Sequence, residues 1–414
     1  MSTNNEDTKR GSWEDFLLRA AREISLTEPQ YEVIDKRYSV LQDILSASDN
    51  PLLAEAHIFV QGSMRLKTTI KPVSGAPDDL DTIDADAIIW LPYAQGASAH
   101  EVLEAINDRF VQGSRVQKDI KPLRRGIRIV YADESPGFHI DITPARAVIG
   151  NAEEKGLGRL EVPDRVTGWK ASSPIPYSDW LSSASMQRIT LESFSKSRGT
   201  FDSATQDPLP AYKDYADQDP LRATIKLLKR HRDEWAIRSC NESNRPISAV
   251  ITTLATHSYL DVAQQSRDKP LRPLDAILAI VHKMPNHIER RGSNYLVCNP
   301  TDPGENFAEK WNRPDEGARY REAFFEWHAS ACESVSLGLE SFESAESFAK
   351  AVNESFGIGS AFITEVNNSI PSNWTLPGRP DGTTRNSVGM SLLFGGVSSS
   401  KNSQVGVKPV DRLG

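Results

Sequence analysis

The chain has 414 residues, more than the roughly 100–200 residues of one compact domain, so the sequence predicts several structural units. Its 48 basic and 56 acidic residues give a formal net charge of −8. This charge argues against constitutive coating of DNA or RNA, because counterion release requires a basic face. No run of roughly 20 apolar residues is present, the N-terminus lacks the apolar stretch of a secretory signal, and the three cysteines (Cys240, Cys298 and Cys332) are widely spaced. We therefore expect a cytoplasmic protein with reduced thiols, without a membrane segment, disulfide framework or zinc site.

Helical and strand patterns alternate in the first part of the chain. Apolar residues recur at helical spacing over residues 12–48. Between residues 50 and 150, short β-rich runs are separated by Pro, Gly and Asp, and one helical pattern covers residues 99–110. The β-rich runs are His57–Val60, Ala87–Leu91, Gly126–Tyr131 and Phe138–Thr143. This alternation predicts an α+β core with a small sheet.

The second part of the chain has a mainly helical pattern. Residues 151–218 are rich in Pro, Ser and Trp and predict irregular segments with one helix near 185–197. Further helical patterns lie at 220–235, 246–262, 271–283 and 315–353. The Ser-, Asn-, Gly- and Pro-rich end predicts a mobile tail. We expect a core with N-terminal helices (1–215), a helical C-terminal domain (216–365) and a flexible tail (366–414).

A Gly-Ser pair follows the first β-rich run, in Gln61-Gly62-Ser63. Where a strand passes into a helix, glycine lets backbone amides approach a phosphate closely, and the serine hydroxyl adds a donor. Taken alone, such a pair more often marks an ordinary helix start. It is not a Walker loop, because Lys67-Thr68 lacks the preceding glycine of that motif.

Three acidic residues are candidates for a metal site. Asp84 and Asp86 begin an apolar strand pattern and lie two residues apart, so their carboxylates project from the same face. Two such charges side by side require a cation, and hard oxygen ligands suit Mg²⁺ or Mn²⁺. Asp141 lies in a second strand pattern, where a carboxylate needs a partner or a metal. If the two strands are neighbours, the three carboxylates converge, although the first pair alone could equally be the polar start of a strand.

Other side chains near these motifs are assigned to packing. His139 directly precedes the strand of Asp141, but we expect it to pack or to form hydrogen bonds rather than to act as a general base, because two metal ions would already lower the pKa of the attacking hydroxyl. Trp169 and Trp180 are expected to be core aromatics that cover the sheet, with stacking on a base as the alternative.

The motifs in series resemble those of the bacterial cGAS/DncV-like nucleotidyltransferases, the cyclic-oligonucleotide synthases of antiphage signalling systems. The segments that carry the resemblance are QGSMRLKTTIKP, DADAIIWLP, FHIDITPA, VPDRVTGWKASSPIPYSDWL, PLRATIKLLKRHRDEW, RPISAVITTLATHSYL and NPTDPGENFAEKW. They cover roughly residues 55–312. The resemblance implies a bilobal α+β protein, in which a polymerase-β-like core with a small mixed sheet is followed by a helical domain that closes the donor pocket.

The resemblance also implies roles for individual residues. Asp84, Asp86 and Asp141 would be the catalytic residues and would bind two Mg²⁺ or Mn²⁺ ions. Gln61 and Ser63, with Gly62 between them, would contact the donor nucleotide.

A basic stripe on the predicted helix 220–235 supplies a further candidate. Arg222, Lys226 and Lys229 recur at helical spacing, which without the resemblance indicates a solvated basic face. By resemblance, Lys229 holds the triphosphate and Ser248 lies near the nucleotide. Lys226 could take the place of Lys229, because the helix register is not fixed by the sequence. Arg128 is a further candidate that could reach the same phosphates from the sheet.

The expected function is synthesis of a cyclic di- or trinucleotide second messenger in antiphage defence, from ATP and/or other nucleoside triphosphates. Pyrophosphate would leave by two-metal nucleotidyl transfer, and the product would act on a downstream effector. One alternative is a nucleotidyltransferase that modifies RNA or tRNA ends, against which the acidic balance argues. The other is a nucleotide-binding regulatory module without turnover, which usually lacks one of the metal carboxylates.

The chain ends in Gly414, within a segment expected to be flexible. Some related synthases are accompanied by ubiquitin-transfer-like proteins that conjugate such a C-terminus to a target. Gly414 is therefore a hypothetical conjugation site for a partner of that kind, with an inert tail as the alternative.

Overall fold

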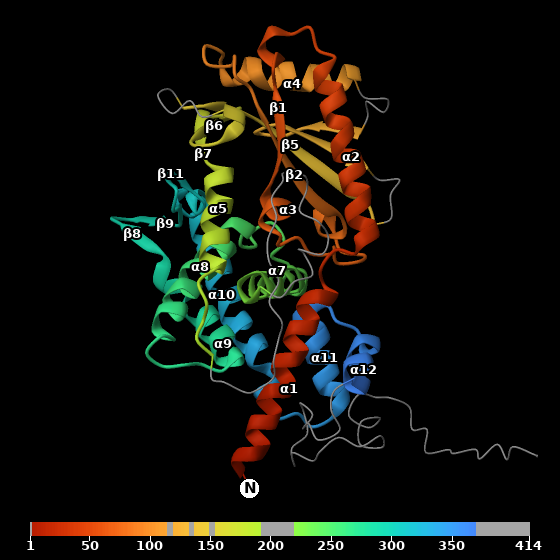
Figure 1. Cartoon of the computed structure of the whole chain (residues 1–414), viewed down its shortest axis with the longest axis vertical. Helices are drawn as coiled ribbons and strands as arrows, with labels where there is room; N and C mark the ends of the chain where they lie inside the picture. Colours follow the sequence, from red (N-terminus) through yellow and green to blue (C-terminus); the bar gives the residue numbers. More distant parts are fainter. Residues whose placement is uncertain (1, 114–118, 132–135, 149–153, 192–218, 370–414) are drawn as a thin grey trace, which may run out of the picture. The chain divides into compact units, whose positions relative to one another are not determined.

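A computed structural model describes residues 2–113, 119–131, 136–148, 154–191 and 219–369 (Figure 1). The described residues form two compact units, one within residues 17–335 and one of residues 2–16 together with 336–369. The division at residues 215 and 365 stays a prediction. The proposed tail beyond residue 369, with Gly414, lies outside the described residues. Within the described part of the chain, no helix is both long and apolar enough to span a membrane.

Helices make up most of the described chain. In order they are α1 (Ser2–Glu23), α2 (Glu28–Ser46), α3 (Gly62–Leu66), α4 (Ala99–Gly113), α5 (Pro174–Ser185), α7 (Pro220–Ser239), α8 (Ser248–Gln265), α9 (Pro273–Lys283), α10 (Gly317–Ser336), α11 (Ala345–Phe356) and α12 (Ser360–Ser369). Short 3₁₀ turns include η1 (Pro51–Leu53), η2 (Asp78–Asp81), η5 (Met284–His287), η6 (Glu309–Asn312) and η7 (Leu337–Leu339).

The 17–335 unit contains a seven-stranded mixed sheet, which lies at the end of the unit covered by α2 and α4 (Figure 1). Its strands are β1 (His57–Gln61), β2 (Ile83–Trp90), β3 (Ile120–Pro122), β4 (Ile127–Tyr131), β5 (Phe138–Ala147), β6 (Leu160–Asp164) and β7 (Gly168–Ser172). They follow the order β1–β2–β5–β4–β3, and β6 joins β5 to β7. The β2–β5 pair is parallel, whereas the other pairs are antiparallel. The small mixed sheet predicted from the sequence is confirmed.

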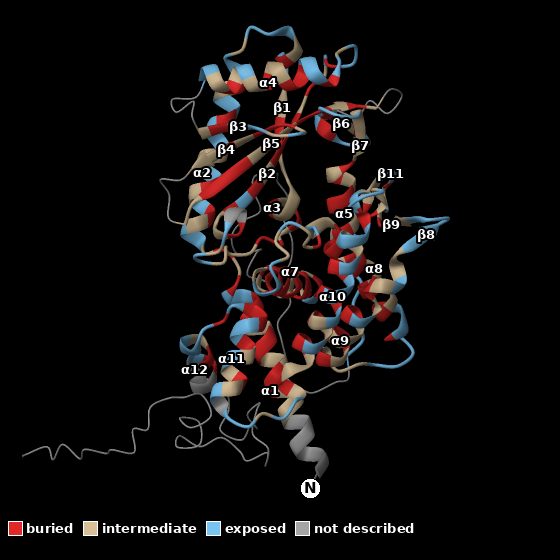
Figure 2. Ribbon diagram, turned by 180° about the vertical axis from the view of Figure 1, so that it is seen from behind, coloured by how far each residue is buried: buried red, intermediate tan, exposed pale blue. Residues whose placement is uncertain are grey.

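The two faces of this sheet differ in chemistry because neighbouring side chains along a strand alternate between them. On β2, Ala85, Ala87 and Ile89 are buried against the apolar residues of α2 and α4, in the core cluster that also includes the β5 residues Ile140 and Ile142 (Figure 2). The intervening positions of β2 and β5 therefore face the opposite side, which is where the candidate acidic residues lie.

The helical part of the 17–335 unit has its own core. Apolar residues of α5, α7, α8, α9 and α10 form one cluster, with fully buried members such as Leu254 and Trp327. In Figure 2 the helix α7 is coloured almost entirely as buried, and its Lys226, Lys229 and Arg232 are each at most 7% exposed. The interpretation of the α7 basic stripe as a solvated face is therefore wrong, because this helix lies inside the protein.

The region after residue 150 is more regular than the sequence indicated. Strands β6 and β7 lie within the segment expected to be irregular, and the helix that the structure describes there is α5, which ends at Ser185. The helix expected near 185–197 is therefore wrong for residues 186–191, and residues 192–197 lie outside the described part. Short strands also interrupt the helical part: β8 (Glu289–Arg291), β9 (Asn294–Leu296), β10 (Cys298–Asn299) and β11 (Asp302–Asn306).

The second unit has a small aromatic core. Trp13 stacks on Phe16 with ring centroids 5.2 Å apart and contacts the edge of Phe348 at 6.1 Å. Gly338 lies directly against the Trp13 ring, where a Cβ would be 2.2 Å away, so only glycine fits at this position. The Lys9 ammonium donates to the backbone carbonyl of Leu339 at 2.7 Å.

Candidate active site

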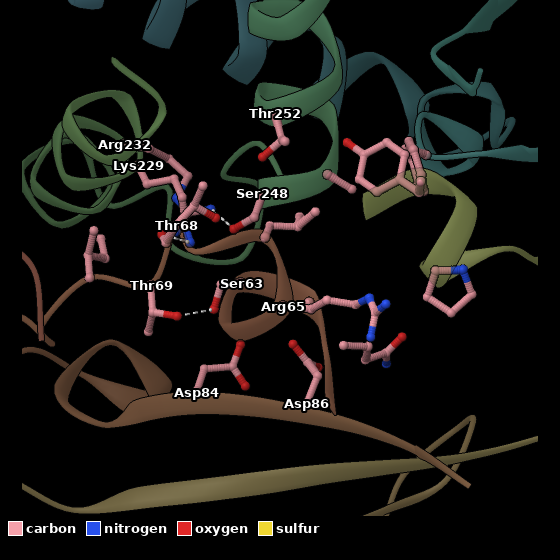
Figure 3. Close-up of a pocket in the computed structure, with 18 of the residues that line it drawn as sticks. Ser63, Arg65, Thr68, Thr69, Asp84, Asp86, Lys229, Arg232, Ser248 and Thr252 are labelled. Atoms are coloured by element: carbon pink, nitrogen blue, oxygen red, sulfur yellow. Dashed lines mark hydrogen bonds between the residues drawn. The ribbon is translucent and has the colours of Figure 1, made fainter. Parts of the chain in front are cut away.

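Strands β2 and β5 bring the three predicted acidic residues together. Asp84 and Asp86 both rise from β2 toward α3, as Figure 3 shows. Asp141 lies directly beside Asp86 on the parallel neighbour β5. Among the described residues, Asp84, His139 and Asp141 each offer a ligand atom, and these atoms lie within 4.8 Å of one another. Sequence spacing alone could predict the Asp84–Asp86 pair, but only the parallel pairing of β2 with β5 adds Asp141.

His139 holds Asp84 in place. Its Nε2 lies 2.9 Å from Asp84 Oδ1, and its Nδ1 lies 3.1 Å from the Thr82 hydroxyl. The imidazole is 3% exposed, so it has no route to a substrate hydroxyl except through the carboxylate. This geometry agrees with the expectation that His139 forms hydrogen bonds and does not act as a general base.

Arg128 makes a two-pronged pair with Asp141. Its Nε donates to Asp141 Oδ1 at 2.6 Å and its Nη2 donates to Oδ2 at 2.8 Å. The two residues are opposite each other on the antiparallel strands β4 and β5, which fixes this pairing. Arg128 was expected to reach nucleotide phosphates, but here its guanidinium is turned onto a carboxylate. Its contact with phosphate stays a prediction.

The crowding of carboxylates produces opposite pKa shifts. Burial raises the pKa of Asp86 well above its ordinary value, and the charges of Asp84 and Asp141 raise it further. The Asp84 side chain is 60% exposed to the cavity, but the protein around the cavity reduces its contact with bulk solvent. This desolvation by itself would raise the pKa of Asp84. The hydrogen bond and charge of His139, with the cations Arg128 and Lys229, outweigh this and lower the pKa of Asp84.

These donors fit divalent cations. Asp84 and Asp141 offer ligand atoms within 4.8 Å of each other and of His139, and Asp86 lies beside Asp141 on the neighbouring strand, although it is not part of that close group. A hard dication would relieve the repulsion between these carboxylates, and carboxylate oxygens are the ligands that Mg²⁺ and Mn²⁺ prefer.

The absence of a side chain at Gly62 leaves room for the Asp86 carboxylate. The backbone of Gly62 has φ +60°, and a Cβ there would lie 1.9 Å from Asp86 Oδ2. Gln61, the last residue of β1, pairs with Asp86 across the sheet, so the chain turns into α3 directly over the carboxylate. The Ser63 hydroxyl accepts a hydrogen bond from Thr69 Oγ1 at 3.1 Å. The Gly-Ser pair therefore lies against the acidic residues, as its place in the sequence suggested.

A first cavity of about 310 Å³ opens above Asp84 and Asp86. Its wall includes Gln61, Gly62 and Ser63, and the opposite side is formed by Lys229, Arg232 and Ser248 (Figure 3). Arg232 donates to the Ser248 hydroxyl at 3.0 Å, which ties α7 to the start of α8. Cations and hydroxyls therefore gather on one side of the carboxylates, an arrangement that suits a polyphosphate.

The helix register separates Lys229 from Lys226. The Lys229 ammonium lies in the first cavity and donates to the Thr68 carbonyl at 2.9 Å. Lys226 donates instead to the Ser25 hydroxyl at 2.9 Å and does not line the cavity. Burial and the nearby Arg232 lower the pKa of Lys229 to about 8, although Asp233, Asp84 and Asp86 oppose the shift.

The other end of the first cavity is aromatic. Tyr177 and Phe307 pack edge to face at 5.4 Å, and the Tyr177 hydroxyl is paired with Thr253 at 2.8 Å. Glu305 lies beside them and accepts from the Asn299 side-chain amide at 2.7 Å. This end offers flat apolar surface with a few polar groups, which suits a nucleobase.

A second cavity of about 730 Å³ borders the same acidic residues. It is lined by Asp86 and Asp141 but not by Asp84, whereas the first cavity is lined by Asp84 and Asp86. The two cavities adjoin, since Asp86, Arg245, Glu305 and Phe307 line both of them. Trp169 lines the second cavity and carries the Arg146 guanidinium 3.8 Å from its ring centre.

Several residues of this site were not singled out from the sequence. Thr68, Thr69, Arg232 and Tyr177 line the first cavity. Arg232 could have been found, because it lies one helical turn after Lys229. Arg65 also lines this cavity, and within the described part of the chain its buried Nε has no hydrogen-bond partner. Trp180 packs against Tyr177 and His257 as a partly buried aromatic, as expected, but it belongs to the helical core and does not cover the sheet.

Comparison with known proteins gives consistent matches. Residues 13–184 match the family described as the second messenger oligonucleotide or dinucleotide synthetase (SMODS) domain. The c-di-GMP synthase of Roseivirga ehrenbergii is 27% identical over 318 residues, 75% of each chain. The fold is similar to that of the Bradyrhizobium diazoefficiens CD-NTase CdnG in complex with GTP, with a TM-score of 0.59 and 18% identity, over 86% of this chain and 98% of that one. It is also similar to the E. coli MS115-1 CdnC:HORMA-deltaN complex, with a TM-score of 0.51 and 14% identity, over 82% and 95% of the two chains. At these identities the two structures establish the fold alone.

Proposed function

We propose that this chain is a nucleotidyltransferase of the cGAS/DncV-like class that joins nucleoside triphosphates into a cyclic dinucleotide second messenger. The c-di-GMP product named for the Roseivirga relative favours the dinucleotide over the trinucleotide and favours GTP as a substrate, with ATP as a second candidate. We further propose that the product serves antiphage signalling by acting on a downstream effector.

The observation that carries this proposal is the position of the carboxylates between two cavities. Asp84 and Asp86 border the first cavity, and Asp86 and Asp141 border the second. Nucleotidyl transfer needs this arrangement, because the α-phosphate of a donor and the hydroxyl of an acceptor must meet at one point from opposite sides. We assign the first cavity to the donor and the second to the acceptor.

Residues of the first cavity would bind and orient the donor. Lys229, Arg232 and Ser248 would hold the triphosphate, because they place two cations and a hydroxyl on the helical side of the cavity. Ser63 and the backbone at Gly62 would contact the phosphates from the sheet side, with Gln61 next to them. Tyr177 and Phe307 would receive the base.

Asp141 would position the attacking hydroxyl of the acceptor at the mouth of the second cavity. His139 would keep the Asp84 carboxylate oriented, and Arg128 would balance the charge of Asp141. Two Mg²⁺ or Mn²⁺ ions bound by the three aspartates would lower the pKa of the attacking hydroxyl and neutralise the departing pyrophosphate. Attack in line with the leaving group would give a linear dinucleotide, and a second transfer within that product would close the ring.

The test is product analysis with a matched pair of variants. Purified protein incubated with all four nucleoside triphosphates and Mg²⁺ should release pyrophosphate and yield a cyclic dinucleotide by mass spectrometry. Asp141→Asn should abolish this product, whereas Asp179→Asn, which changes an exposed carboxylate on α5, should not. Extension of an added RNA oligonucleotide instead of cyclic product would reassign the enzyme to RNA-end modification. Unchanged turnover in Asp141→Asn would reject the proposed site.

A further inference from the structure

Arg65 is a cation of the first cavity that lies apart from the predicted triphosphate-binding residues. It belongs to α3, three residues after Gly62, and it lines the first cavity but not the second. Figure 3 shows its side chain extending away from Lys229 and Arg232, on the side of the cavity where Asp86 rises from β2. The first cavity therefore carries positive charge in two separate places.

The guanidinium of Arg65 has hydrogen-bonding capacity that the described residues do not use. Its Nε has almost no exposed surface and no hydrogen-bond partner among them. By contrast, Lys229 donates to the Thr68 carbonyl, and Arg232 donates to the Ser248 hydroxyl. A buried donor without an acceptor is unfavourable, so a ligand that brings acceptors to Arg65 gains from this geometry.

The place of Arg65 determines which part of a donor nucleotide it meets. The triphosphate is assigned to the side of Lys229, and the base is assigned to the aromatic pair Tyr177 and Phe307. Because Arg65 points away from Lys229, it lies on the nucleoside side of the reacting phosphate. The hydrogen-bond acceptors that it can reach there belong to the base or to the ribose.

A guanidinium can distinguish one purine from another. It carries only donors, in a planar fork that matches two neighbouring acceptors. Guanine presents such a pair, O6 and N7, whereas adenine presents the acceptor N7 beside the N6 amino group, which is itself a donor. Pyrimidines have no N7. An arginine against this edge of the base therefore favours guanine.

We propose that Arg65 selects guanine in the first cavity, by donating two hydrogen bonds to O6 and N7 of the donor base. The inference rests on the proposed function, because it takes the first cavity as the donor site. It extends that function by naming a residue that determines the choice of base. Since Arg65 does not line the second cavity, this selection applies to the donor and not to the acceptor.

Two variants of Arg65 and one control test this role. Arg65→Met removes every donor but keeps a long side chain, and Arg65→Lys keeps the charge but loses the planar fork. The control Arg291→Met changes a 71% exposed arginine of the β8–β9 hairpin, which lines neither cavity. Thermal unfolding checks that wild type and the three variants are folded.

The assay separates the donor from the acceptor. A 2′,3′-dideoxynucleoside triphosphate has no ribose hydroxyl and can only donate. A guanosine triphosphate with a methylene group between its α- and β-phosphorus atoms cannot release pyrophosphate and can only accept. With this acceptor held constant, its hydroxyl loses a proton and attacks the donor α-phosphate, one phosphodiester bond forms, and pyrophosphate leaves. The rate of pyrophosphate release gives kcat/KM for each donor.

Three donors are compared: the guanine compound, its 7-deaza analogue and the adenine compound. The 7-deaza analogue carries a C–H group in place of N7 and keeps O6, the sugar and the triphosphate. It therefore removes one of the two acceptors assigned to Arg65 and leaves the phosphate contacts unchanged.

We expect wild type and Arg291→Met to prefer the guanine donor at least about tenfold over both the 7-deaza donor and the adenine donor. In Arg65→Met both preferences should fall to within about threefold, and Arg65→Lys should lie between these two results. Preferences that remain in Arg65→Met, or a wild type that uses the three donors equally, would overturn the inference and leave the proposed function intact.

A structural role of Arg65 gives a different result. Burial raises the pKa of Tyr38 on α2, and the charge of Arg65 opposes this rise, so the side chain also acts on that helix. A role confined to such support would lower kcat/KM for all three donors by one common factor, and the unchanged ratios would contradict base selection. A wild type that releases no pyrophosphate, either in this assay or from all four nucleoside triphosphates, would reject the proposed function itself.

Discussion

Replacement of Gly62 by alanine should lower catalytic activity far more than it lowers the stability of the fold. At this position φ is +60°, and the new Cβ would lie 1.9 Å from Asp86 Oδ2. Real Cβ contacts essentially never fall below 3.0 Å, so the carboxylate oxygen has to retreat by about 1 Å. Gly62→Ala therefore combines a backbone penalty with a displaced catalytic side chain.

The two effects have different magnitudes. The left-handed backbone should cost alanine about 1–2 kcal/mol of unfolding free energy. A displacement of about 1 Å at a reacting centre can lower the rate by about 100-fold, and Asp86 borders both cavities. We expect kcat/KM for formation of the cyclic product to fall by about that factor, with a higher Mg²⁺ concentration needed for half-maximal activity.

Gly292→Ala is the matched control. Gly292 lies in the β8–β9 hairpin with φ +63°, and a Cβ there would meet no atom within 4 Å. The control should lose a similar unfolding free energy in urea titrations and keep its turnover. If Gly62→Ala and Gly292→Ala have activities within about threefold of each other, then the position of Asp86 beneath Gly62 is not required for catalysis.

Three further predictions test the site and its support. Lys229→Met should lower kcat/KM for the nucleoside triphosphate at least about tenfold. Lys226→Met should leave kcat/KM within about threefold of wild type, because Lys229 lines the donor cavity and Lys226 does not. Equal losses in the two variants would reject this helix register. The pKa of Asp164 is low because hydrogen bonds from Arg124, two backbone N–H groups and Arg125 outweigh its burial. The ionised Asp164 therefore stabilises the folded protein above about pH 4, and this contribution is lost as the pH falls further. Asp164→Asn should lower the unfolding free energy by about 1–3 kcal/mol at neutral pH. In this variant the unfolding free energy should decline less steeply below about pH 4 than in wild type. A parallel decline in both proteins would contradict this assignment. Mg²⁺ should raise the unfolding temperature of wild type but not of Asp141→Asn, and turnover that persists in excess EDTA would exclude a divalent cation from the reaction.

Local periodicity predicted the strands β1, β2, β4 and β5 but missed β3, β6 and β7 of the same sheet. The alternation of Ala85 and Ala87 with Asp84 and Asp86 places the apolar side chains in the core and the carboxylates on the opposite face. Neighbouring residues on such a strand differ strongly in polarity, so the buried and the polar face of the strand can be assigned from the sequence alone. The segment around α5 lacks this contrast, and the helix expected near 185–197 is wrong for residues 186–191, while α5 lies before them.

The contacts of long side chains could not be predicted in the same way. Arg128 lies opposite Asp141 only because β4 and β5 are antiparallel in one particular register. Lys310 and Arg313 are more than 180 residues away from Arg124, and no local pattern indicates that they border the same cavity. The three aspartates were found because Asp84 and Asp86 are neighbours on one strand and Asp141 belongs to a recognisable motif. Lys310, Arg313 and Arg124 do not lie together on one strand and do not belong to one recognisable motif.

Asp86 borders both cavities, and this has a consequence for inhibition. A single molecule that carries a donor-like triphosphate and an acceptor-like triphosphate, joined through an unreactive bridge, could occupy both spaces at once. Because the second half of such a ligand binds intramolecularly, its affinity should far exceed that of either nucleotide alone. It would also lie beside Asp86, which borders both cavities together with Glu305, so a resistant enzyme that changed Asp86 or the glycine above it would lose turnover as well.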